Sequence, residues 1–575
     1  MFYALRALRP AGSAGWGLRN NILAGLTVGI VALPLSMALA IAAGVPPQHG
    51  LYTAIVAGAV IALTGGSPVN VSGPTAAFVV VLLPIVQEHG LGGLLVAGLL
   101  AGLVLLGLGL ARMGRLIEVV PYPVTVGFTA GIAVVIATLQ IKDLLGLDLG
   151  LLDGHFTDKV AAIVTALPTL RWQEAAIGGL TLAVLLLWPR FDRRLPAHRV
   201  AVLVGSVAAW AGGLLIDGFQ VETIGSRFHY VVDGMAGSGI PPVLPEFAWP
   251  WQQPGPDGQP IGLSFDLINS LLGAALAIAI LGALESLLCA VVADGMSGRR
   301  HDPNEELIGQ GLGNIVAPLF GGIPATAAIA RTATNIRAGA TSPLAAVVHA
   351  LFLLAAVLLL ADLLAYVPMA SMAALLLIVA WNMSDAKHFV RTLRVAPLPD
   401  RATLLVCFTL TVLFDMVIAV GVGMALAGIL FIRRSIALTG VSVIETPRTE
   451  HTHQDRLPPG VIVYDINGPL FFGSAQRALK SIMAINPGIR VVVLDMADVT
   501  MLDMTGIVAM ESIVAGLSGR GVKLVIANLA PRMIRKLGRA GVRPRRDHIA
   551  LARSLDDALA RARRLSEPQA PASPA

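Results

Sequence analysis

A polytopic α-helical membrane protein with a smaller α/β domain at its C-terminal end is the fold class that this sequence predicts. Of its 575 residues, 55% are hydrophobic and only 13% are charged, and the mean hydropathy of +0.77 lies well outside the range of soluble domains. Apolar runs of roughly 15–25 residues fill the segment 19–434, the length that crosses a bilayer as a helix. From about 445 onward charge returns and the runs shorten, so we expect a domain boundary there.

The apolar runs predict fourteen membrane spans. The first run, 22–43, is long and is not followed by a cleavage signature and a soluble mature domain, so we expect it to be a retained span. The predicted spans are 20–43, 50–66, 75–88, 91–111, 122–140, 174–189, 200–216, 267–293, 305–320, 326–337, 343–361, 367–382, 401–415 and 416–432.

Basic residues predict the orientation of these spans. They gather in the loops that follow even-numbered spans, whereas the long loop 217–262 contains only Arg227. We therefore expect both termini and the α/β domain in the cytoplasm. The net charge of +6 is explained by this bias, because no basic run with interleaved aromatics indicates a nucleic-acid partner. The basic residues are Arg112, Arg115, Arg190, Arg193, Arg194, Arg199, Arg299, Arg300, Arg337, Lys387, Arg391, Arg394, Arg401, Arg433 and Arg434.

Several kinds of chemistry have no support in the sequence. The two cysteines, Cys289 and Cys407, both lie in apolar runs, which leaves neither a disulfide framework nor a Cys/His metal site. No Walker motif, zinc-binding helix or nucleophile elbow is present, so we expect neither an enzyme nor a cofactor nor a metal. The segment HDPNEELIGQG (301–311) contains a histidine and acids, but Asp302 as N-cap and Pro303 as first residue make a helix start the better interpretation.

A short motif repeats at an offset of 256 residues. GGSP at 65–68 recurs as GGIP at 321–324, and each copy leads into a short helix of small residues. The copies fall at the third and tenth predicted spans, so they enter the membrane from opposite sides. An inverted repeat of seven plus seven spans is typical of secondary transporters, whose paired broken helices form a substrate site near the membrane midplane.

The starts of the two short helices predict an anion site. The first N–H groups of a helix have no intrahelical partner and carry partial positive charge, and small residues let a substrate approach the backbone. The alternative is that these small residues only permit tight helix packing, although packing alone does not require paired breaks. The candidate residues are Thr75, Ala76, Ala77, Ala327, Ala328 and Ile329.

Ionisable residues inside predicted spans are further candidates. Glu285 lies eighteen residues into the span 267–293, where a carboxylate is costly unless it is paired, hydrated or protonated. It is a candidate proton carrier, or else a structural carboxylate held by hydroxyl or backbone groups. Arg331 either adds positive potential to the anion site or extends its long side chain to the cytoplasmic surface. We expect His349 to be a core histidine whose hydrogen bonds are satisfied.

The C-terminal segment predicts a small α/β domain of about 110 residues. Strands rich in β-branched residues alternate there with amphipathic helices. The motif LDMTG places Thr505 at a helix start, with Asp503 just before it. Thr505 is either an N-cap or a position that is phosphorylated or contacts a partner. The final EPQAPASPA is predicted to be disordered.

These motifs resemble those of the SulP family, the sulfate-permease relatives of solute carrier family 26, over essentially the whole chain. The resemblance rests on AGLTVGIVALPLSMALAIAAGVPPQHGLYTA, GGSPVNVSGPTAAF, ELIGQGLGNIVAP and GGIPATAAIARTATNIRAGATSP. LDMTG resembles the motif of STAS domains, which also occurs in anti-sigma-factor antagonists. Within the family, the sequence around and including AWNMSDAKHF is most similar to bacterial four-carbon dicarboxylate transporters.

The resemblance implies a core domain and a gate domain, a homodimer, elevator-like movement of the core and a location in the bacterial inner membrane. It also implies an anion bound between the starts of the third and tenth helices and lined by the first and eighth spans. Carried over residue by residue, the implied site consists of Thr75, Ala76, Ala328, Ile329, Ala330, Arg331, Leu35, Leu39 and Glu285.

One departure from the family pattern bears on the coupling ion. The pattern of sodium-coupled bicarbonate relatives is an acid, a threonine one turn later and a threonine in the tenth helix. By this resemblance the corresponding residues here are Glu285, Cys289 and Ile329. Two oxygen ligands are therefore missing, which disfavours a hard cation and favours a proton. Thr505 stands where the antagonists carry a phosphorylated serine, but STAS domains of transporters are often not known to be phosphorylated.

We therefore expect a proton-coupled symporter for dicarboxylates such as succinate, fumarate and aspartate, with Glu285 as proton carrier. Two alternatives remain open. One is bicarbonate or sulfate transport, with or without sodium coupling, and the other is a membrane scaffold or regulator that acts through the STAS domain and a cytoplasmic protein partner. The expected domains are an N-terminal segment 1–18, a transporter domain 19–434 with repeats at about 19–217 and 265–434, a linker 435–454, a STAS domain 455–565 and a tail 566–575.

Overall fold

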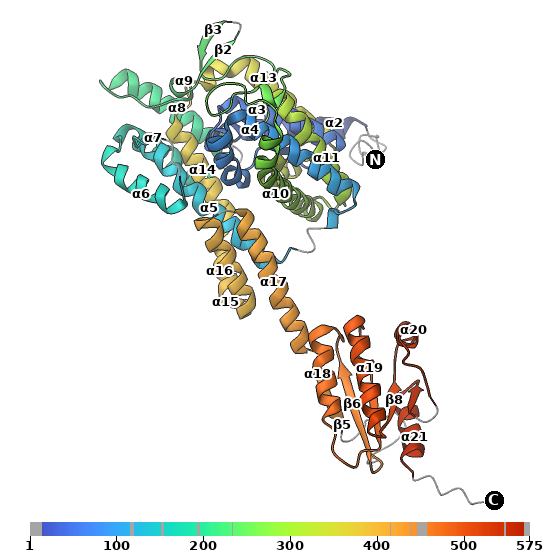
Figure 1. Ribbon diagram of the computed structural model, residues 1–575. Coiled ribbons are helices and arrows are strands. Elements are labelled where there is room, and N and C mark those ends of the chain that lie inside the picture. Colours follow the sequence, from blue (N-terminus) through green and yellow to red (C-terminus); the bar gives the residue numbers. More distant parts are fainter. Residues whose placement is uncertain are drawn as a thin grey trace, which may run out of the picture. The chain divides into compact units, whose positions relative to one another are not determined.

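The computed structural model divides the chain into two compact units, Met1–Ala427 and Gly428–Ala575 (Figure 1). Most of the predicted N-terminal segment, the second half of the predicted linker and nearly all of the predicted tail lie outside the described residues. The structure describes residues 14–115, 120–150, 154–192, 196–232, 234–414, 416–438, 440–444, 457–545 and 548–567.

The first repeat contains one helical segment for each predicted span. The third and fourth spans form one helix, α4, whose backbone breaks at Gly90 with φ 68° and ψ −170°. A Cβ at Gly90 would approach the carbonyl carbon of Gly255 to 2.5 Å, so both the dihedral angles and the space require glycine. The helices are α2 (Ala14–Ala42), α3 (Pro47–Thr64), α4 (Ala76–Leu110), α5 (Tyr122–Leu145), α7 (Trp172–Phe191) and α8 (Ala197–Leu215).

The second repeat likewise has a helix at each predicted span, so fourteen helical segments stand where fourteen spans are predicted. Among the described residues, nine helices are long and apolar enough to cross a membrane, and the remaining spans are short or broken. The helices are α10 (Phe265–Ser297), α11 (Pro303–Val316) with the 3₁₀ turn η4 (Ala317–Phe320), α12 (Ile329–Arg337), α13 (Leu344–Leu364), α14 (Met369–Ser384), α16 (Leu398–Leu413) and α17 (Met416–Leu438).

Several short elements lie in segments that the sequence analysis treats as loops. They are polar or amphipathic, and a search for long apolar runs does not detect an amphipathic helix or a short hairpin. These elements are α6 (Phe156–Ala166), η2 (Leu167–Thr169), α9 (Ile224–Arg227), β2 (His229–Val232), β3 (Met235–Ser238), η3 (Pro250–Gln252) and α15 (Ala386–Val395).

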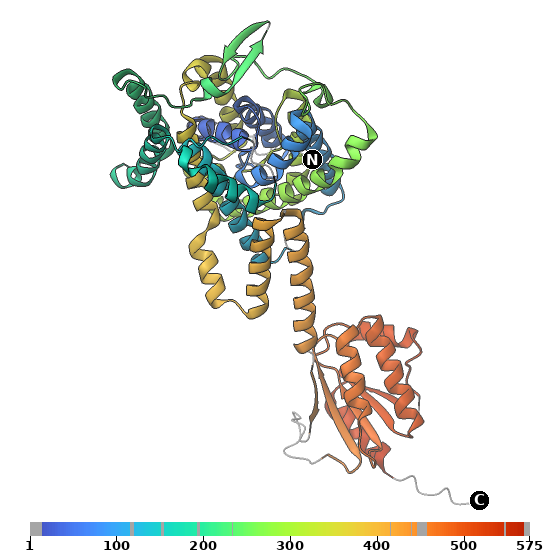
Figure 2. The same cartoon turned by 60° about the vertical axis from the view of Figure 1, so that its left-hand side comes forward.

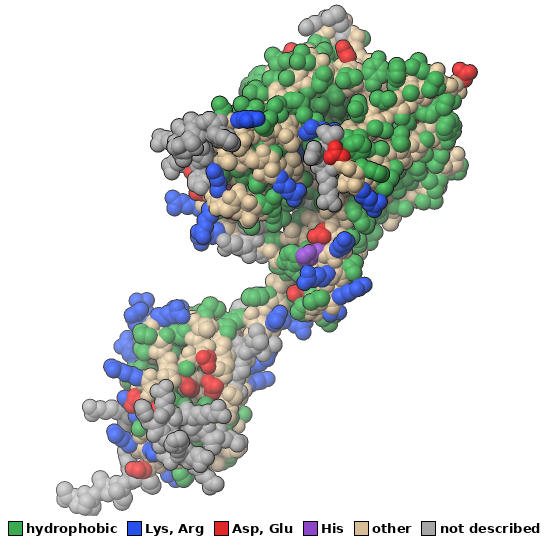
Figure 3. Space-filling view, turned by 180° about the vertical axis from the view of Figure 1, so that it is seen from behind, with side chains coloured by type: hydrophobic (Ala, Val, Ile, Leu, Met, Phe, Trp, Pro, Cys, Tyr) green, Lys and Arg blue, Asp and Glu red, His purple; other side chains and the backbone are tan. Residues whose placement is uncertain are grey.

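The helices of the first unit pack as two groups (Figure 2). A core group consists of α2, α3, α4, α10, α11, α12 and α13, and a gate group consists of α5, α7, α8, α14 and α16. Glycines bring α4 and α11 into close contact, because a Cβ at Gly311 would lie 2.6 Å from the amide nitrogen of Leu106. Figure 3 shows hydrophobic side chains over most of the visible face of this unit, as expected for a surface in contact with lipid.

The second unit is a five-stranded sheet in the order β5-β6-β7-β8-β9, with β5 antiparallel and the other strands parallel. Every residue of β7 is buried, because α18, α19 and α20 cover one face of the sheet and α21 covers the other. Strand β5 lies within the segment predicted to be a linker. The elements are β5 (Gly440–Ile444), β6 (Val461–Asn467), α18 (Phe472–Met483), β7 (Val491–Asp495), α19 (Met504–Gly519), β8 (Lys523–Ala527), α20 (Pro531–Arg539), β9 (Ile549–Ala552) and α21 (Leu555–Ser566).

Candidate functional site

The segments that follow the two copies of the repeated motif meet in a short pair of strands. β1 (Ser72–Gly73) pairs antiparallel with β4 (Thr326–Ala327), with Ser72 opposite Ala327 and Gly73 opposite Thr326. Each strand leads directly into one of the two helices that the sequence analysis singles out, β1 into α4 and β4 into α12. Because the strands are antiparallel, the two helices start on opposite sides of one strand pair.

Neither helix start is capped by its own side chain. Thr75 is the N-cap of α4 and Ala328 that of α12, and neither forms a side-chain cap hydrogen bond. The leading amides of both helices are therefore left to other partners, the arrangement that binds anions. The helix predicted over 326–337 begins only at Ile329, because Thr326 and Ala327 are used by β4.

Glu285 lies beside the start of α4. The Thr75 hydroxyl donates a hydrogen bond to Glu285 Oε2 over 2.9 Å, which joins α10 to the break before α4. The Glu285 side chain is partly exposed, and the described residues give it no cationic partner. Thr75 thus presents its hydroxyl to a carboxylate rather than to the amides of its own helix.

Arg331 is buried, with 1% of its surface exposed, which excludes the alternative that its side chain extends to the cytoplasmic surface. Its Nη2 donates to Ser36 Oγ and to the Pro74 carbonyl, each over 3.2 Å. Within the described part of the chain, Nε and Nη1 have no hydrogen-bond partner. The guanidinium therefore places an uncompensated positive charge directly behind the strand pair. A Cβ at Gly73 would come within 2.5 Å of Nη1, so a larger residue at this position would displace the guanidinium.

His349 is also buried, but the prediction that its hydrogen bonds are satisfied is wrong. Neither Nδ1 nor Nε2 has a partner among the described residues. It lies on α13, whose neighbours are α2 and α3.

The remaining candidates differ in exposure. Ala76, Ala77, Ala327 and Leu39 are buried and help to pack the frame of the site. Thr75, Ala328 and Leu35 are half-buried, whereas Ile329 is 41% exposed and Ala330 is exposed. The side of the site that a solute can reach is therefore built from the half-buried and exposed residues.

A polar face of α11 forms hydrogen bonds with the segment 65–72, which runs from the first motif to β1 and is called the first broken segment below. The sequence analysis did not identify this polar face. The buried carboxylate of Glu306 accepts hydrogen bonds from the amides of Gly66 and Ser67, at 3.0 and 3.1 Å, and from Asn70 Nδ2 at 3.2 Å. Gln310 Nε2 donates both to Glu306 Oε1 and to Ser72 Oγ. The α11 helix thereby fixes the path of the chain from the first motif to β1.

Side chains of α11 and α12 also form hydrogen bonds with the segment after the second motif and with the residues just before β1. Asn314 donates to the Ala325 carbonyl and accepts from its amide, both over 2.8 Å. Thr332 Oγ1 accepts from the Val71 amide, and Asn335 Nδ2 donates to the Val69 carbonyl. The second repeat therefore supplies side chains that satisfy the broken backbone of the first.

The sequence contains a signal for this network. Glu306, Gln310 and Asn314 recur at intervals of four in a segment otherwise made of apolar residues and glycines, which places them on one helix face. Buried polar side chains at that spacing must find hydrogen-bond partners. The Asp302 cap was predicted and is confirmed, because its carboxylate accepts from the amides of Asn304 and Glu305.

The described residues contain no group of three or more His, Cys, Asp or Glu side chains placed to hold a metal ion. Cys289 lies next to the network and donates from Sγ to Thr332 Oγ1 over 3.3 Å.

In the second unit, the start of α19 corrects one prediction. Asp503 is the N-cap, and its carboxylate accepts from the Gly506 amide over 2.7 Å. Thr505 lies inside the first turn and is half-buried, which excludes the alternative that it is the N-cap.

Comparison with known proteins places both units. The model of the Sulfate permease family matches residues 18–407, and that of the STAS domain matches residues 453–558. The chain is 40% identical to "Putative sulfate transporter YvdB" of Bacillus subtilis (strain 168), over 91% of this chain and 94% of that protein. It is 28% identical to "Bicarbonate transporter BicA" of Picosynechococcus sp., over 90% of each protein.

Two solved structures are similar to this fold. The overall structure of SLC26A9 aligns with a TM-score of 0.80 at 18% identity, covering 96% of this chain and 91% of that one. The transmembrane domain of the cyanobacterial bicarbonate transporter BicA aligns with a TM-score of 0.59 at 26% identity, covering 72% of this chain and 97% of that one.

Proposed function

This chain belongs to the sulfate permease family and carries a C-terminal STAS domain, and from that membership we propose that it is a secondary active transporter of small anions. In its specific form, the proposal is proton-coupled uptake of four-carbon dicarboxylates by an elevator mechanism. The chain acts as a homodimer in the bacterial inner membrane, with both termini in the cytoplasm.

One observation carries the proposal, the hydrogen bond from Thr75 to Glu285 beside two uncapped helix starts. The helix starts attract an anion through their amides and dipoles. The buried charge of Arg331 adds positive potential from behind the strand pair. A substrate carboxylate is held there by backbone groups, with Thr75 and Ala328 at the two helix starts.

Glu285 couples a proton to this anion by charge. An ionised carboxylate beside the helix starts repels a bound anion, and protonation removes that repulsion. The anion and the proton therefore bind together and cross together. Glu285 holds the proton, while Thr75 orients the carboxyl group through its hydroxyl.

The dicarboxylate assignment is supported by the similarity of AWNMSDAKHF and its surroundings to four-carbon dicarboxylate transporters. The proton is supported by the residues that stand at the sodium-ligand positions of bicarbonate relatives, because Cys289 and Ile329 offer no oxygen ligand there.

The test is uptake of labelled succinate into proteoliposomes that contain the purified chain. An inward proton gradient is expected to drive accumulation, and Glu285→Gln is expected to abolish the effect of the gradient while succinate exchange without a gradient persists. Glu88→Gln is the control, because 78% of the Glu88 side-chain surface is exposed. Uptake that does not depend on pH, or a gradient effect that remains in Glu285→Gln, would contradict the coupling mechanism.

Sulfate or bicarbonate is the second candidate substrate, and the names of the relatives YvdB and BicA favour it. A competition panel of sulfate, bicarbonate, succinate, fumarate and aspartate in the same proteoliposomes decides between them. A chain that lacks the STAS domain and still transports would exclude a purely regulatory protein.

A further inference from the structure

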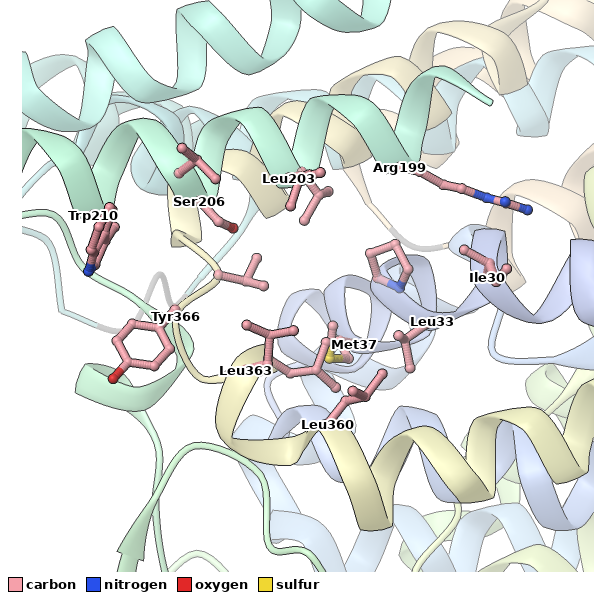
Figure 4. A pocket seen from close by; sticks show the side chains of 15 residues that line it. Ile30, Leu33, Met37, Arg199, Leu203, Ser206, Trp210, Leu360, Leu363 and Tyr366 are labelled. Atoms are coloured by element: carbon pink, nitrogen blue, oxygen red, sulfur yellow. The ribbon is translucent and has the colours of Figure 1, made fainter. Parts of the chain in front are cut away.

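A groove of about 570 Å³ separates one helix of the gate group from two helices of the core group. Figure 4 shows α8 along one side of it and α2 and α13 along the other. None of the candidate site residues lines this groove, so it is separate from the site at the strand pair. Its lining consists of Ile30, Leu33, Pro34, Met37, Arg199, Val202, Leu203, Ser206, Val207, Trp210, Leu360, Leu363, Leu364, Tyr366 and Val367.

The α8 side of the groove is a single helical stripe. Its residues recur at steps of three and four, so they share one face of the helix. Several are exposed even though they are large and apolar, among them Leu203 at 65% and Trp210 at 60%. The stripe consists of Arg199, Val202, Leu203, Ser206, Val207 and Trp210.

Arg199 places a cation at one end of this apolar groove (Figure 4). Its Nη2 donates to the Thr27 carbonyl over 2.9 Å, which holds the side chain between α8 and α2. Its Nε is buried and has no hydrogen-bond partner in the part of the chain that the structure describes. An anionic group could accept further hydrogen bonds from this guanidinium.

The length of the groove matches one leaflet of a bilayer. Trp210 lies eleven positions after Arg199 in α8, which is about 16 Å at a rise of about 1.5 Å per residue. Half of a hydrocarbon core of about 30 Å is about 15 Å. Arg199 is the third residue of α8, so it lies near the membrane surface, and the aromatic rings of Trp210 and Tyr366 lie at the far end of the groove.

We propose that this groove binds an anionic phospholipid, with the phosphate at Arg199 and one acyl chain along the α8 stripe. Arg199 lies at the start of α8, on the side of the membrane that the basic residues predict to face the cytoplasm, where anionic lipids are enriched. The bound lipid contacts both helix groups at once, so it stabilises one relative position of the core and the gate.

Photolabelling of the full chain in nanodiscs tests the site. The nanodiscs consist of phosphatidylethanolamine with a trace of diazirine-labelled phosphatidylglycerol, phosphatidylethanolamine or free fatty acid, and the labelled peptides are mapped by mass spectrometry. Phosphatidylglycerol is expected to label the groove-lining peptides of α8, α2 and α13 roughly fivefold more than phosphatidylethanolamine, the gain from one well-placed charge.

Variants separate the head group from the acyl chain. Arg199→Gln is expected to lower the ratio of phosphatidylglycerol to phosphatidylethanolamine labelling to about one. Arg190→Gln and Ser206→Ala are expected to leave it unchanged, because Arg190 is exposed and Ser206 lies two turns deeper on α8. Val207→Trp fills the groove and is expected to reduce labelling by both lipids.

Three results would overturn the proposal. They are equal labelling by the two phospholipids in the unmodified chain, an unchanged preference in Arg199→Gln, and groove labelling by the free fatty acid as strong as that by phosphatidylglycerol. None of these readouts depends on transport, so the outcome is independent of the substrate.

Discussion

Thr75 and Glu285, 210 residues apart in the sequence, are joined by a 2.9 Å hydrogen bond. The bond connects the first residue before α4 to the middle of α10, and through β1 and β4 it is linked to the start of α12. The residue proposed to bind the anion and the residue proposed to carry the proton are therefore adjacent. The following predictions test this arrangement and the elements that hold it.

Removing the Thr75 hydroxyl is expected to impair transport. Thr75→Val keeps the shape of the side chain but removes the donor to Glu285, a hydrogen bond to a chargeable group worth about 1.5–3 kcal/mol. We expect uptake to fall roughly tenfold to a hundredfold. Thr75→Ser retains the hydroxyl and is expected to stay close to the unmodified chain. Initial rates of labelled-substrate uptake measure the difference, and equal rates for Val and Ser would contradict the role of the hydroxyl.

The Glu306 network is expected to be required for stability. Both carboxylate oxygens of Glu306 accept hydrogen bonds, so Glu306→Gln must turn its NH₂ group toward a donor in either orientation. We expect a loss of about 1–3 kcal/mol, visible as a lower midpoint in thermal unfolding. Glu88→Gln is the exposed control, and a midpoint that drops equally for both variants would argue against the network.

Gly73→Ala is expected to reduce transport while the fold is retained. The added Cβ would lie 2.5 Å from Nη1 of Arg331 and displace the guanidinium from behind the strand pair. We expect the KM for the anion to rise about tenfold, the effect of losing one favourable charge interaction. Gly107→Ala is the matched control on α4, because no atom lies within 4 Å of the added Cβ. An unchanged KM in Gly73→Ala would remove Arg331 from the site.

Acid is expected to weaken the link between α5 and the segment after α8. Arg227 binds Glu222 and, over 2.8 Å, Asp143. Burial raises the pKa of Glu222, but the hydrogen bonds and charge of Arg227 outweigh burial and hold the pKa below its ordinary value of 4.5. A lowered folded-state pKa means that this stabilisation is complete above the ordinary value and is lost as the pH falls through the folded value.

Glu222→Gln is therefore expected to flatten the decline of the thermal midpoint on acidification below about pH 4.5. Asp217→Asn changes an exposed carboxylate in the same segment and is expected to leave the decline as it is. The measurement is the unfolding midpoint as a function of pH, and identical profiles for Glu222→Gln and the unmodified chain would contradict the assignment.

The start of α19 distinguishes Asp503 from Thr505. Asp503→Ala removes the N-cap and is expected to destabilise the second unit by about 1 kcal/mol. Thr505→Ala removes a half-buried hydroxyl inside the first turn and is expected to cost less. Hydrogen exchange of the amides in α19 reports the difference, and equal protection in the two variants would refute the assigned cap.

Much of this architecture can be predicted from local features of the sequence. Most spans are runs of apolar residues of bilayer length, and hydrophobicity along the chain is enough to find them. The GGSP and GGIP copies predict two broken helices, because backbone breaks need glycine and proline wherever they occur. Glu285 was found for a similar reason, since a carboxylate in an apolar run is costly and hence informative.

Other features depend on contacts between distant segments, and no local pattern determines them. The register of Ser72 with Ala327 fixes where α12 begins, so the structure and not the apolar run sets that boundary. The direction of the Arg331 side chain was undecided because a long, flexible cation can reach water or fold inward with similar local geometry. Packing against Ser36 and Pro74 decides it.

The sequence by itself thus determined the membrane fold, the inverted repeat and the residues of the two helix starts, because each is a property of a few neighbouring residues. Only the tertiary structure decided that Thr75 donates a hydrogen bond to Glu285 and that Glu306 binds the amides that follow the first helix break. It also decided that Arg331 is buried, with its guanidinium against the Pro74 carbonyl. These contacts join residues more than 200 positions apart, and their energies come from burial and hydrogen-bond geometry that exist only after the two repeats have packed together.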